Sequence, residues 1–256
     1  MKHPAFPCFF SLLRDSRLGM VLFVLFFSLT TTGQTPSKTK SYISHLQWDS
    51  LLKKHVDQHG NVNYQGFLKD QQNLGDYLSY LSQHSPTKAW GKKEQLAYYI
   101  NLYNAATVAL IISEYPIKSI KDIKNPWGKK WILLHDKKVS LNDIEHKILR
   151  KLNEPRIHFA INCASTSCPP LQNQAFTTNI LEQQLQEATV NFINSPKYNK
   201  ITKDKLSLSL IFKWYKKDFT ANGSLTDYIS QYHKEDIDEN PTITYLDYDW
   251  SLNENK

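Results

Sequence analysis

The chain has 256 residues, 41% of them hydrophobic, and a formal net charge of +7. Three cysteines are too few for a scaffold built on disulfides, so the core must come from side-chain packing. The lysines are dispersed apart from short pairs, whereas nucleic-acid binding favours a clustered basic stripe, so no nucleic-acid partner is expected. Length and apolar content fit one globular domain.

Residues 1–33 have the layout of a secretory signal peptide. Basic residues including Arg14 and Arg17 precede the apolar run Leu18–Leu29, and small residues follow this run as far as Gly33. The run is shorter than the roughly 20 apolar residues that a membrane span needs. We therefore predict cleavage near Gly33, export to the periplasm or the medium, and no transmembrane segment in the mature chain. An uncleaved N-terminal anchor is the alternative.

Residues 34–44 are predicted to form a polar linker, and residues 45–252 a single domain that begins with helices. The first helical face is expected to hold Trp48, Leu51, Leu52 and Val56. A second helical region is expected from Phe67 to Leu81. The third helix, roughly Lys93 to Ser113, is apolar on nearly every side, which predicts a buried central helix.

A hairpin is predicted next, with strands Trp131–Leu134 and Val139–Leu141. Ser140 is then expected to cap a short helix that runs to about Arg150. Asp143, three residues after Ser140, would complete a capping box, because its side chain can bond back to the backbone of the cap.

The second half of the domain is predicted to alternate short strands with helices. A strand, Ile157–Ile161, should lead into a loop with two cysteines, followed by a helix from Thr178 to Asn194. Two paired strands, at Ile201 and over residues 206–211, are expected around the turn 203–205, then a helix Ser224–Tyr232 and a last strand Ile243–Trp250. This pattern indicates an α+β fold, in which a buried central helix and further helices pack on a small, mostly antiparallel sheet.

Two amides lie on the predicted buried helix. Asn101 and Asn104 are three residues apart, so they share one helix face. A buried amide without a partner costs about 1–3 kcal/mol. The favoured interpretation is that these side chains clamp the backbone of a loop, and a direct catalytic role is the alternative.

The helix that follows Ser140 carries a carboxylate within its apolar stripe. Leu141, Ile144 and Ile148 form the stripe at helical spacing, Glu145 falls inside it, and His146 lies at its side. A buried carboxylate needs a cationic or hydrogen-bonding partner, and Arg150, Arg156 and His158 are the nearest candidates in sequence. Glu145 is therefore either one half of a buried ion pair or an active-site carboxylate.

The cysteine loop carries Cys163 and Cys168 five residues apart and ends at Pro169. The two thiols can form a disulfide, or Cys163 can be a nucleophile activated by a histidine, and a metal site is disfavoured because a second ligand pair is missing. His146 or His158 could act as the base. On a strand, His158 would face away from Cys163 unless the chain bulges. The residues alone favour a disulfide or an inert thiol over a nucleophile.

Four ordered segments, residues 95–108, 140–150, 156–171 and 210–219, resemble the domain-of-unknown-function family 547. The similarity covers about residues 45–250 and implies a widely distributed domain without an established activity. Its recurring positions correspond to Asn101, Tyr103, Asn104, Glu145, His146, His158, Cys163 and Pro169. Many relatives keep the first loop cysteine while the second can be serine, and some eukaryotic relatives carry the domain beside a glutaredoxin-like module. The resemblance therefore implies a role for the first cysteine beyond pairing.

Two functional hypotheses follow. The first is an exported thiol-dependent hydrolase or acyl transferase acting on a peptide or cell-wall component. Its nucleophile would be Cys163, its base His146 or His158, and Glu145 would orient the imidazole. The second is a non-catalytic binding or structural module with a Cys163–Cys168 disulfide and a buried polar network. Structural or binding roles are expected for Asn101, Tyr103, Asn104, Cys168 and Pro169. Neither hypothesis requires a metal or a cofactor.

Overall fold

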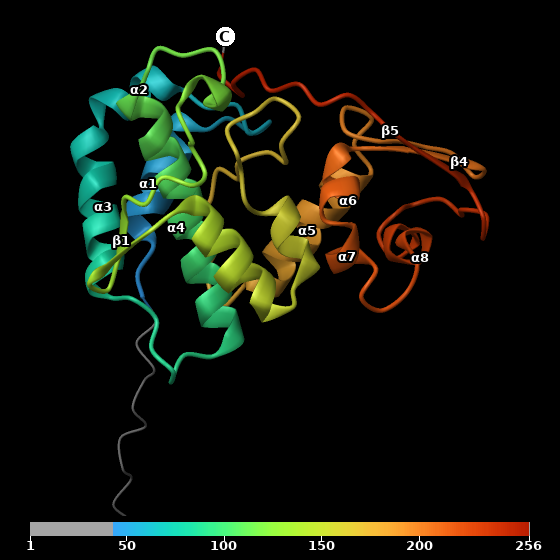
Figure 1. Ribbon diagram of the computed structural model, residues 1–256, viewed down its shortest axis with the longest axis horizontal. Helices are drawn as coiled ribbons and strands as arrows, with labels where there is room; N and C mark the ends of the chain where they lie inside the picture. Colours follow the sequence, from blue (N-terminus) through green and yellow to red (C-terminus); the bar gives the residue numbers. More distant parts are fainter. Residues whose placement is uncertain (1–42, 256) are drawn as a thin grey trace, which may run out of the picture. The chain divides into compact units, whose positions relative to one another are not determined.

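The computed structural model describes residues 43–255, which lie in one compact unit, Ser41–Lys256. The predicted leader and most of the predicted linker lie outside the described residues. The α-helices are α1 (Leu46–His55), α2 (Tyr64–Lys69), α3 (Gln71–Gln83), α4 (Lys92–Ser113), α5 (Leu181–Ile193), α6 (Leu210–Trp214), α7 (Lys216–Phe219) and α8 (Leu225–Ser230) (Figure 1). The strands are β1 (Ile132–Leu134), β2 (Lys137–Val139), β3 (Lys200–Ile201), β4 (Lys205–Leu208) and β5 (Thr242–Tyr245).

Helix α4 is the predicted central helix. Nearly all of its side chains from Leu96 to Ile112 are buried, because α2 and α3 contact it on one side and the segment after β2 contacts it on another. Figure 1 shows α4 between these two groups of elements. The helix is long and apolar enough to cross a membrane, but 89% of its most apolar window is buried inside the fold. Its apolar character is therefore that of a core helix.

The second predicted helical region is interrupted. It consists of α2 and α3, which meet at Asp70. The carboxylate of Asp70 accepts hydrogen bonds from Lys54 Nζ and from His55 Nε2, both at 2.6 Å. This residue therefore ties the junction of the two helices to the end of α1. The helical spacing of apolar residues continues through Asp70, so the sequence pattern does not indicate this break.

The predicted hairpin is present, with Ile132 paired to Val139, but its second strand is Lys137–Val139 rather than Val139–Leu141. The capping box is also present, since Ser140 N–H donates to Asp143 Oδ2 at 3.0 Å and Asp143 N–H donates to Ser140 Oγ at 3.1 Å. The helix itself differs from the prediction. It continues as a π-helix, η2 (Asp143–Ile148), and then as a 3₁₀ helix, η3 (Leu149–Leu152). π-Helical turns are rare and frequently occur at functional sites.

The predicted strand Ile157–Ile161 is wrong, because this segment forms a 3₁₀ helix, η4 (Pro155–Phe159). Pro155 fits the first turn of a helix, where its missing N–H is not needed. Glu154 caps this turn by accepting from the N–H of Arg156. Because the segment is not a strand, strand alternation does not turn His158 away from the cysteine loop.

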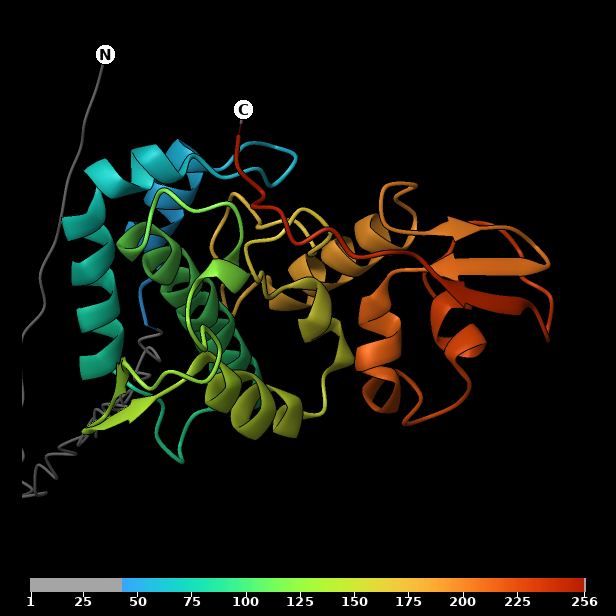
Figure 2. The same ribbon diagram turned by 45° about the horizontal axis from the view of Figure 1, so that its top comes forward.

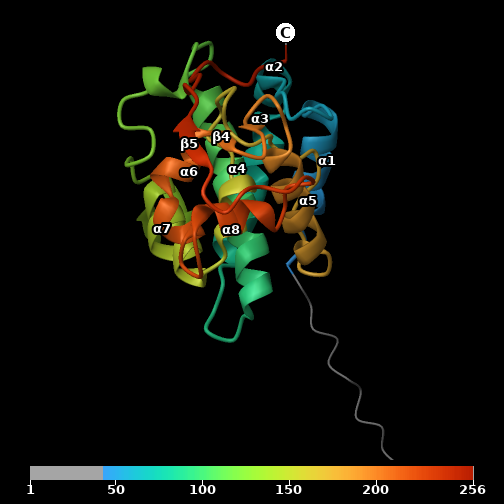
Figure 3. The same ribbon diagram turned by 90° about the vertical axis from the view of Figure 1, so that its right-hand side faces the viewer.

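The C-terminal elements gather at one end of the described unit, away from α1–α3 (Figure 2). Strand β3 pairs antiparallel with β4, but β5 pairs parallel with β4, so the last two strands do not form a hairpin. The predicted strand beyond Leu208 is wrong because Ser209 caps α6 by accepting from Ile211 N–H. Helix α5 begins at Leu181 rather than at Thr178. Figure 3 views this end directly, with α6, α7 and α8 beside β4 and β5.

The chain after β5 is not a strand, and it runs back across the molecule towards α1 and α2 (Figure 2). On its way it contacts the cysteine loop. Thr166 N–H donates to Ser251 O at 2.8 Å, and Asp249 N–H donates to Ser167 Oγ at 2.9 Å. The α+β fold with a buried central helix is confirmed, and its strands divide into two small sheets.

Candidate functional site

A cavity of about 250 Å³ opens beside the cysteine loop. Its walls come from η2, η4, the cysteine loop, α6 and the chain after β5. Among the predicted site residues it is lined by Tyr103, Glu145, His146, His158, Cys163, Cys168 and Pro169. The fold thus brings together residues that are more than 60 positions apart in the sequence. Asn101 and Asn104 do not line this cavity.

The two asparagines of α4 bind the backbone of neighbouring loops. Asn104 Nδ2 donates to Ala160 O at 2.9 Å, and its Oδ1 accepts from Asn162 N–H at 2.8 Å. Asn101 makes the same pair of bonds with both backbone groups of Phe176, at 2.7 and 3.0 Å. Both side chains are fully satisfied by backbone groups. Asn104 therefore fixes the chain immediately before Cys163, and Asn101 fixes a loop further along.

Cys163 and Cys168 are free thiols in this structure, so the predicted disulfide is not formed. Their Sγ atoms lie 3.0 Å apart, with Cys163 half-buried and Cys168 buried. Cys163 Sγ also lies 3.4 Å from Ser165 Oγ and 3.3 Å from Tyr248 OH. Hydrogen bonding with Cys168, and then with Ser165 and Tyr248, lowers the pKa of Cys163 to about 7 against the opposing effect of burial. Burial raises the pKa of Cys168.

The backbone next to Cys163 has an uncommon conformation. Ala164 adopts a left-handed conformation with φ of 61°, which is uncommon for a residue with a β-carbon. Asn162 supports it, because its Oδ1 accepts from Ala164 N–H and its Nδ2 donates to Pro169 O, both at 2.8 Å. The sequence analysis missed Asn162. Left-handed backbone at a non-glycine residue often marks a functional loop.

Several N–H groups of the loop already have acceptors. Cys163 N–H donates to Cys168 Sγ at 2.9 Å, and Thr166 N–H donates to the chain after β5. The loop backbone therefore provides little of an oxyanion site. On the cavity wall the exposed amide of Asn142 is an available donor, whereas the hydroxyl of Tyr248 already interacts with Cys163 Sγ and Ser165 Oγ.

His158 is fixed by a carboxylate that the sequence analysis missed. Its Nε2 lies 2.8 Å from Asp218 Oδ2, and the same carboxylate accepts from Arg150 Nε at 2.6 Å and Nη2 at 2.7 Å. Burial opposes ionisation of Asp218, but the bonds from His158 and Arg150 prevail and hold its pKa below the ordinary value. Burial lowers the pKa of His158. Asp218 lies within the segment 210–219, so the resemblance marked its region without indicating its partner.

These bonds determine which nitrogen of His158 carries the proton. An ionised carboxylate only accepts hydrogen bonds, so Nε2 of the neutral ring must donate to Asp218. Nδ1 is then a free acceptor, and it is buried without a hydrogen-bond partner. Tyr215 stacks on the ring with centroids 3.8 Å apart. The imidazole is thus held in one orientation with a basic nitrogen available.

His146 lies in a different environment on the same cavity. Its side chain is 42% exposed, and its Nδ1 lies 3.2 Å from Arg150 Nη1. Among the residues that the structure describes, neither His146 nor His158 forms a hydrogen bond with Cys163 Sγ.

Glu145 is buried, with only 4% of its surface exposed. Its Oε2 accepts from Tyr103 OH at 3.2 Å, but its Oε1 has no hydrogen-bond partner. The predicted ion pairs are wrong, because Arg150 binds Asp218 and Arg156 binds acidic groups elsewhere. His146 Nδ1 lies 3.9 Å from Oε1. Glu145 therefore places a carboxylate in the cavity wall without a strong cationic partner.

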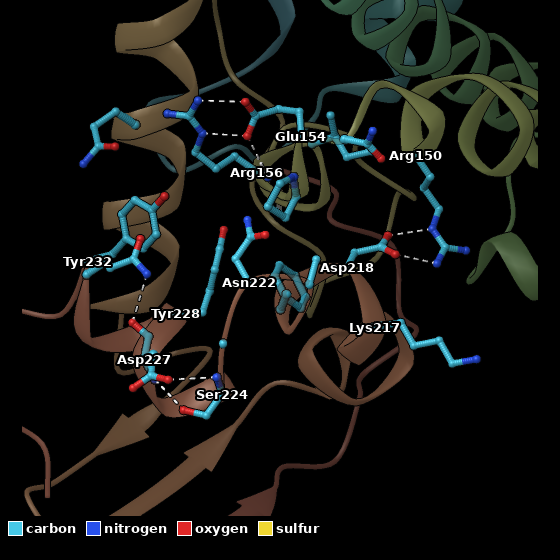
Figure 4. A pocket seen from close by; sticks show the side chains of 18 of the residues that line it. Arg150, Glu154, Arg156, Lys217, Asp218, Asn222, Ser224, Asp227, Tyr228 and Tyr232 are labelled. Atoms are coloured by element: carbon cyan, nitrogen blue, oxygen red, sulfur yellow. Dashed lines mark hydrogen bonds and ion pairs between the residues drawn. The ribbon is translucent and has the colours of Figure 1, made fainter. Parts of the chain in front are cut away.

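A larger cavity, about 870 Å³, is lined by Arg150 and Asp218 among other residues (Figure 4). It contains no cysteine, and its arginines are already paired. Figure 4 shows Arg156 bonded to Glu154 and Arg150 bonded to Asp218 at separate places on its wall. Among residues 43–255 there is no group of three or more side chains suited to hold a metal ion. Of these two cavities, the smaller one is therefore the one lined by the two thiols.

Replacing Cys168 with alanine should raise the pKa of Cys163. The Cys168 thiol is the hydrogen-bonding group that contributes most to the lowered pKa, and without it the Cys163 thiolate is less stabilised. The rate of iodoacetamide labelling of Cys163, measured against pH, should rise through a midpoint near 7 in the native protein. The midpoint should be higher in Cys168→Ala. Ser230→Ala, at an exposed position of α8, is the control, and an unchanged midpoint in Cys168→Ala would contradict this account.

Residues 87–193 match the family model "Protein of unknown function, DUF547". This region contains Asn101, Asn104, the η2–η4 segment and the cysteine loop, but it ends before Asp218 and Tyr248. No curated protein and no solved structure matches the chain. The resemblance found in the sequence is thus confirmed over residues 87–193, which match this family of unknown function.

Proposed function

We propose that this protein is a thiol-dependent amide hydrolase or acyl transferase. Cys163 is the nucleophile, His158 is the general base, and Asp218 positions the imidazole. The observation that carries this proposal is the free Nδ1 of His158, on a ring fixed by Asp218, in the same cavity as a thiol whose pKa lies near 7. A nucleophile, an imidazole and an orienting polar group recur in acyl-transfer enzymes of unrelated folds.

The reaction proceeds in two steps. In the first, the Cys163 sulfur attacks the acyl carbon, its proton passes to His158 Nδ1, and the imidazole returns this proton to the departing amine. The product is a thioester on Cys163. In the second, His158 takes a proton from water or from an incoming amine, which attacks the thioester and releases the thiol. The amide of Asn142, on the cavity wall, donates to the oxyanion.

The hydrogen bond between His158 and Cys163 is not made in this structure. Catalytic hydrogen bonds often form only when the substrate is bound. His158 suits the role of base better than His146, because His146 contacts Arg150 whereas His158 Nδ1 has no partner. The alternative of a structural module loses one of its supports, since it required a Cys163–Cys168 disulfide and both thiols are free.

Export through the leader 1–33 and a linker over residues 34–44 are part of the same proposal. They place a domain of residues 45–252 in the cell envelope, where peptides and cell-wall amides are available as substrates. The apolar run Leu18–Leu29 supports export, as described above.

The proposed function predicts covalent acylation of Cys163 by a reactive ester. Addition of p-nitrophenyl acetate should give a burst of p-nitrophenolate, about one equivalent, followed by slow turnover. Peptide mapping should locate the acetyl group on Cys163. Cys163→Ala is the matched control and should show no burst. A burst that persists in Cys163→Ala, or acetylation only at lysines, would contradict the proposal.

A further inference from the structure

Aromatic side chains form most of the wall around Cys163. The cavity is lined by Tyr103, Trp127, Trp214, Tyr215, Tyr248 and Trp250. They come from α4, the loop before β1, α6 and the chain after β5. The chemistry of an amide hydrolase needs only a small number of polar groups. The many aromatic rings at this cavity therefore indicate a role in recognising the substrate.

Three of these rings pack against one another at the cavity. The centroids of Trp214 and Tyr248 lie 4.8 Å apart, those of Tyr248 and Trp250 4.6 Å, and those of Trp214 and Trp250 5.8 Å. Trp214 is 46% exposed although it belongs to this cluster. A large aromatic side chain that lines a cavity and stays this exposed is available to a ligand.

Two basic side chains of the protein already lie over aromatic rings that line this cavity. Lys121 Nζ lies 4.0 Å from the centroid of the Trp250 ring, and the Arg150 guanidinium lies 5.6 Å from that of Tyr215. The face of an aromatic ring is electron-rich and attracts a positive charge within about 6 Å. The cavity between these rings is therefore electrostatically suited to a cation.

Glu145 adds a negative charge to the same wall. Its Oε1 is buried and has no hydrogen-bond partner, and an acceptor left in this condition costs about 1–3 kcal/mol. The basic groups nearby form no hydrogen bond with this oxygen: Arg150 is bonded to Asp218, and His146 Nδ1 lies 3.9 Å away, where it pairs with Glu145 only when the ring is charged. Burial and then the charge of Glu145 raise the pKa of Tyr103. The unpartnered oxygen calls for a donor that the described residues do not supply.

We propose that this cavity binds a primary alkylammonium group of the substrate, with Glu145 Oε1 accepting an N–H and the rings of Trp214, Tyr248 and Trp250 surrounding the charge. A quaternary cation would satisfy the rings but could not donate to Glu145. A neutral apolar or sugar ring would leave Glu145 unpaired. The volume of about 250 Å³ accommodates a short alkyl chain. As a statement about the substrate the inference rests on the proposed function, and the amine would be a side chain of the amide substrate or the acyl acceptor.

The test is a binding titration that does not depend on the thiol. In Cys163→Ser at neutral pH, tryptophan fluorescence should change saturably with n-butylammonium chloride and about tenfold or more weakly with n-butanol of the same shape. Potassium chloride controls for ionic strength. If n-butanol binds as well as n-butylammonium, the cavity is merely apolar and the inference is wrong. If tetramethylammonium binds as tightly as n-butylammonium, Glu145 is not the acceptor and the inference is also wrong.

Two variants locate the binding site. Glu145→Gln should weaken n-butylammonium binding about tenfold or more, and Trp214→Leu should weaken it severalfold. Glu187→Gln, an exposed carboxylate on α5, is the matched control and should bind like the parent. Thermal melting checks that each variant is folded, and the exposure of Trp214 keeps that variant informative if Glu145→Gln is unstable. Unchanged binding in folded Glu145→Gln and Trp214→Leu would overturn the inference. Because Cys163 is absent here, failure of the ester acylation leaves this test unaffected.

Discussion

Asn104→Ala should lower the free energy of unfolding by about 3 kcal/mol, since it leaves a buried carbonyl and a buried N–H without partners, each at a cost of about 1–3 kcal/mol. These groups are the carbonyl of Ala160 and the N–H of Asn162, which flank Ile161, two residues before Cys163. Urea unfolding followed by circular dichroism measures the loss.

Asn101→Ala separates stability from reactivity. It breaks two equivalent bonds, with Phe176, and should cost a similar free energy of unfolding. Only Asn104→Ala, however, should change the iodoacetamide reactivity of Cys163 under conditions where both proteins are folded, because of these two α4 side chains only Asn104 binds the backbone next to Cys163. Asn179→Ala, at an exposed position, should stay within about 0.5 kcal/mol of the parent. Equal reactivity of Cys163 in folded Asn104→Ala and Asn101→Ala would contradict the role assigned to Asn104.

His158→Gln should slow both formation and hydrolysis of the acyl group on Cys163 by about 10²–10⁴, the usual contribution of a positioned general base. The variant keeps a polar side chain but lacks a titrating nitrogen. His146→Gln is the matched control, and its acylation and turnover with p-nitrophenyl acetate should stay close to those of the parent. If His146→Gln shows the large decrease and His158→Gln does not, the assignment of the base is reversed.

Two variants of Asp218 separate its effect on the orientation of the His158 ring from the effect of its charge, in the same assay. Asp218→Asn retains an oxygen that can accept from His158 Nε2, whereas Asp218→Ala retains none and leaves Arg150 unpaired as well. We therefore expect the smaller loss of turnover in Asp218→Asn. A positioning role also predicts a change in the pH profile of turnover, because the carboxylate favours the protonated form of the His158 ring. Loss of stability alone would not move this profile.

Structural features that depend on residues close together in the chain were predictable from the sequence. The apolar periphery of residues 93–113 gave the central helix, and the spacing of Ser140 and Asp143 gave a capping box that the structure contains. The buried position of Glu145 and the exposed position of His146 also followed from periodicity, although η2 is a π-helix. These features depend on residues within one or two turns of each other, where the pattern of side chains carries the information.

Long-range relations were not predictable in the same way. His158 and Asp218 are 60 residues apart, and Cys163 and Tyr248 are 85 apart, so no local pattern indicates either contact. The apolar run Ile157–Ile161 resembles a strand, but Pro155 and the Glu154 cap make a 3₁₀ turn, and no neighbouring strand is available to pair with it. Tertiary context decided these segments, as it commonly does for short apolar runs.

The central claim is that Cys163 is a reactive thiol that ionises near neutral pH, while Cys168 is a buried donor that stays protonated. The most direct measurement is iodoacetamide labelling of the folded protein, purified without reductant and mapped by peptide mass spectrometry. The account predicts modification of Cys163 and protection of Cys168 until the protein is unfolded. Two cysteines joined in one disulfide-linked peptide, or preferential modification of Cys168, would contradict it.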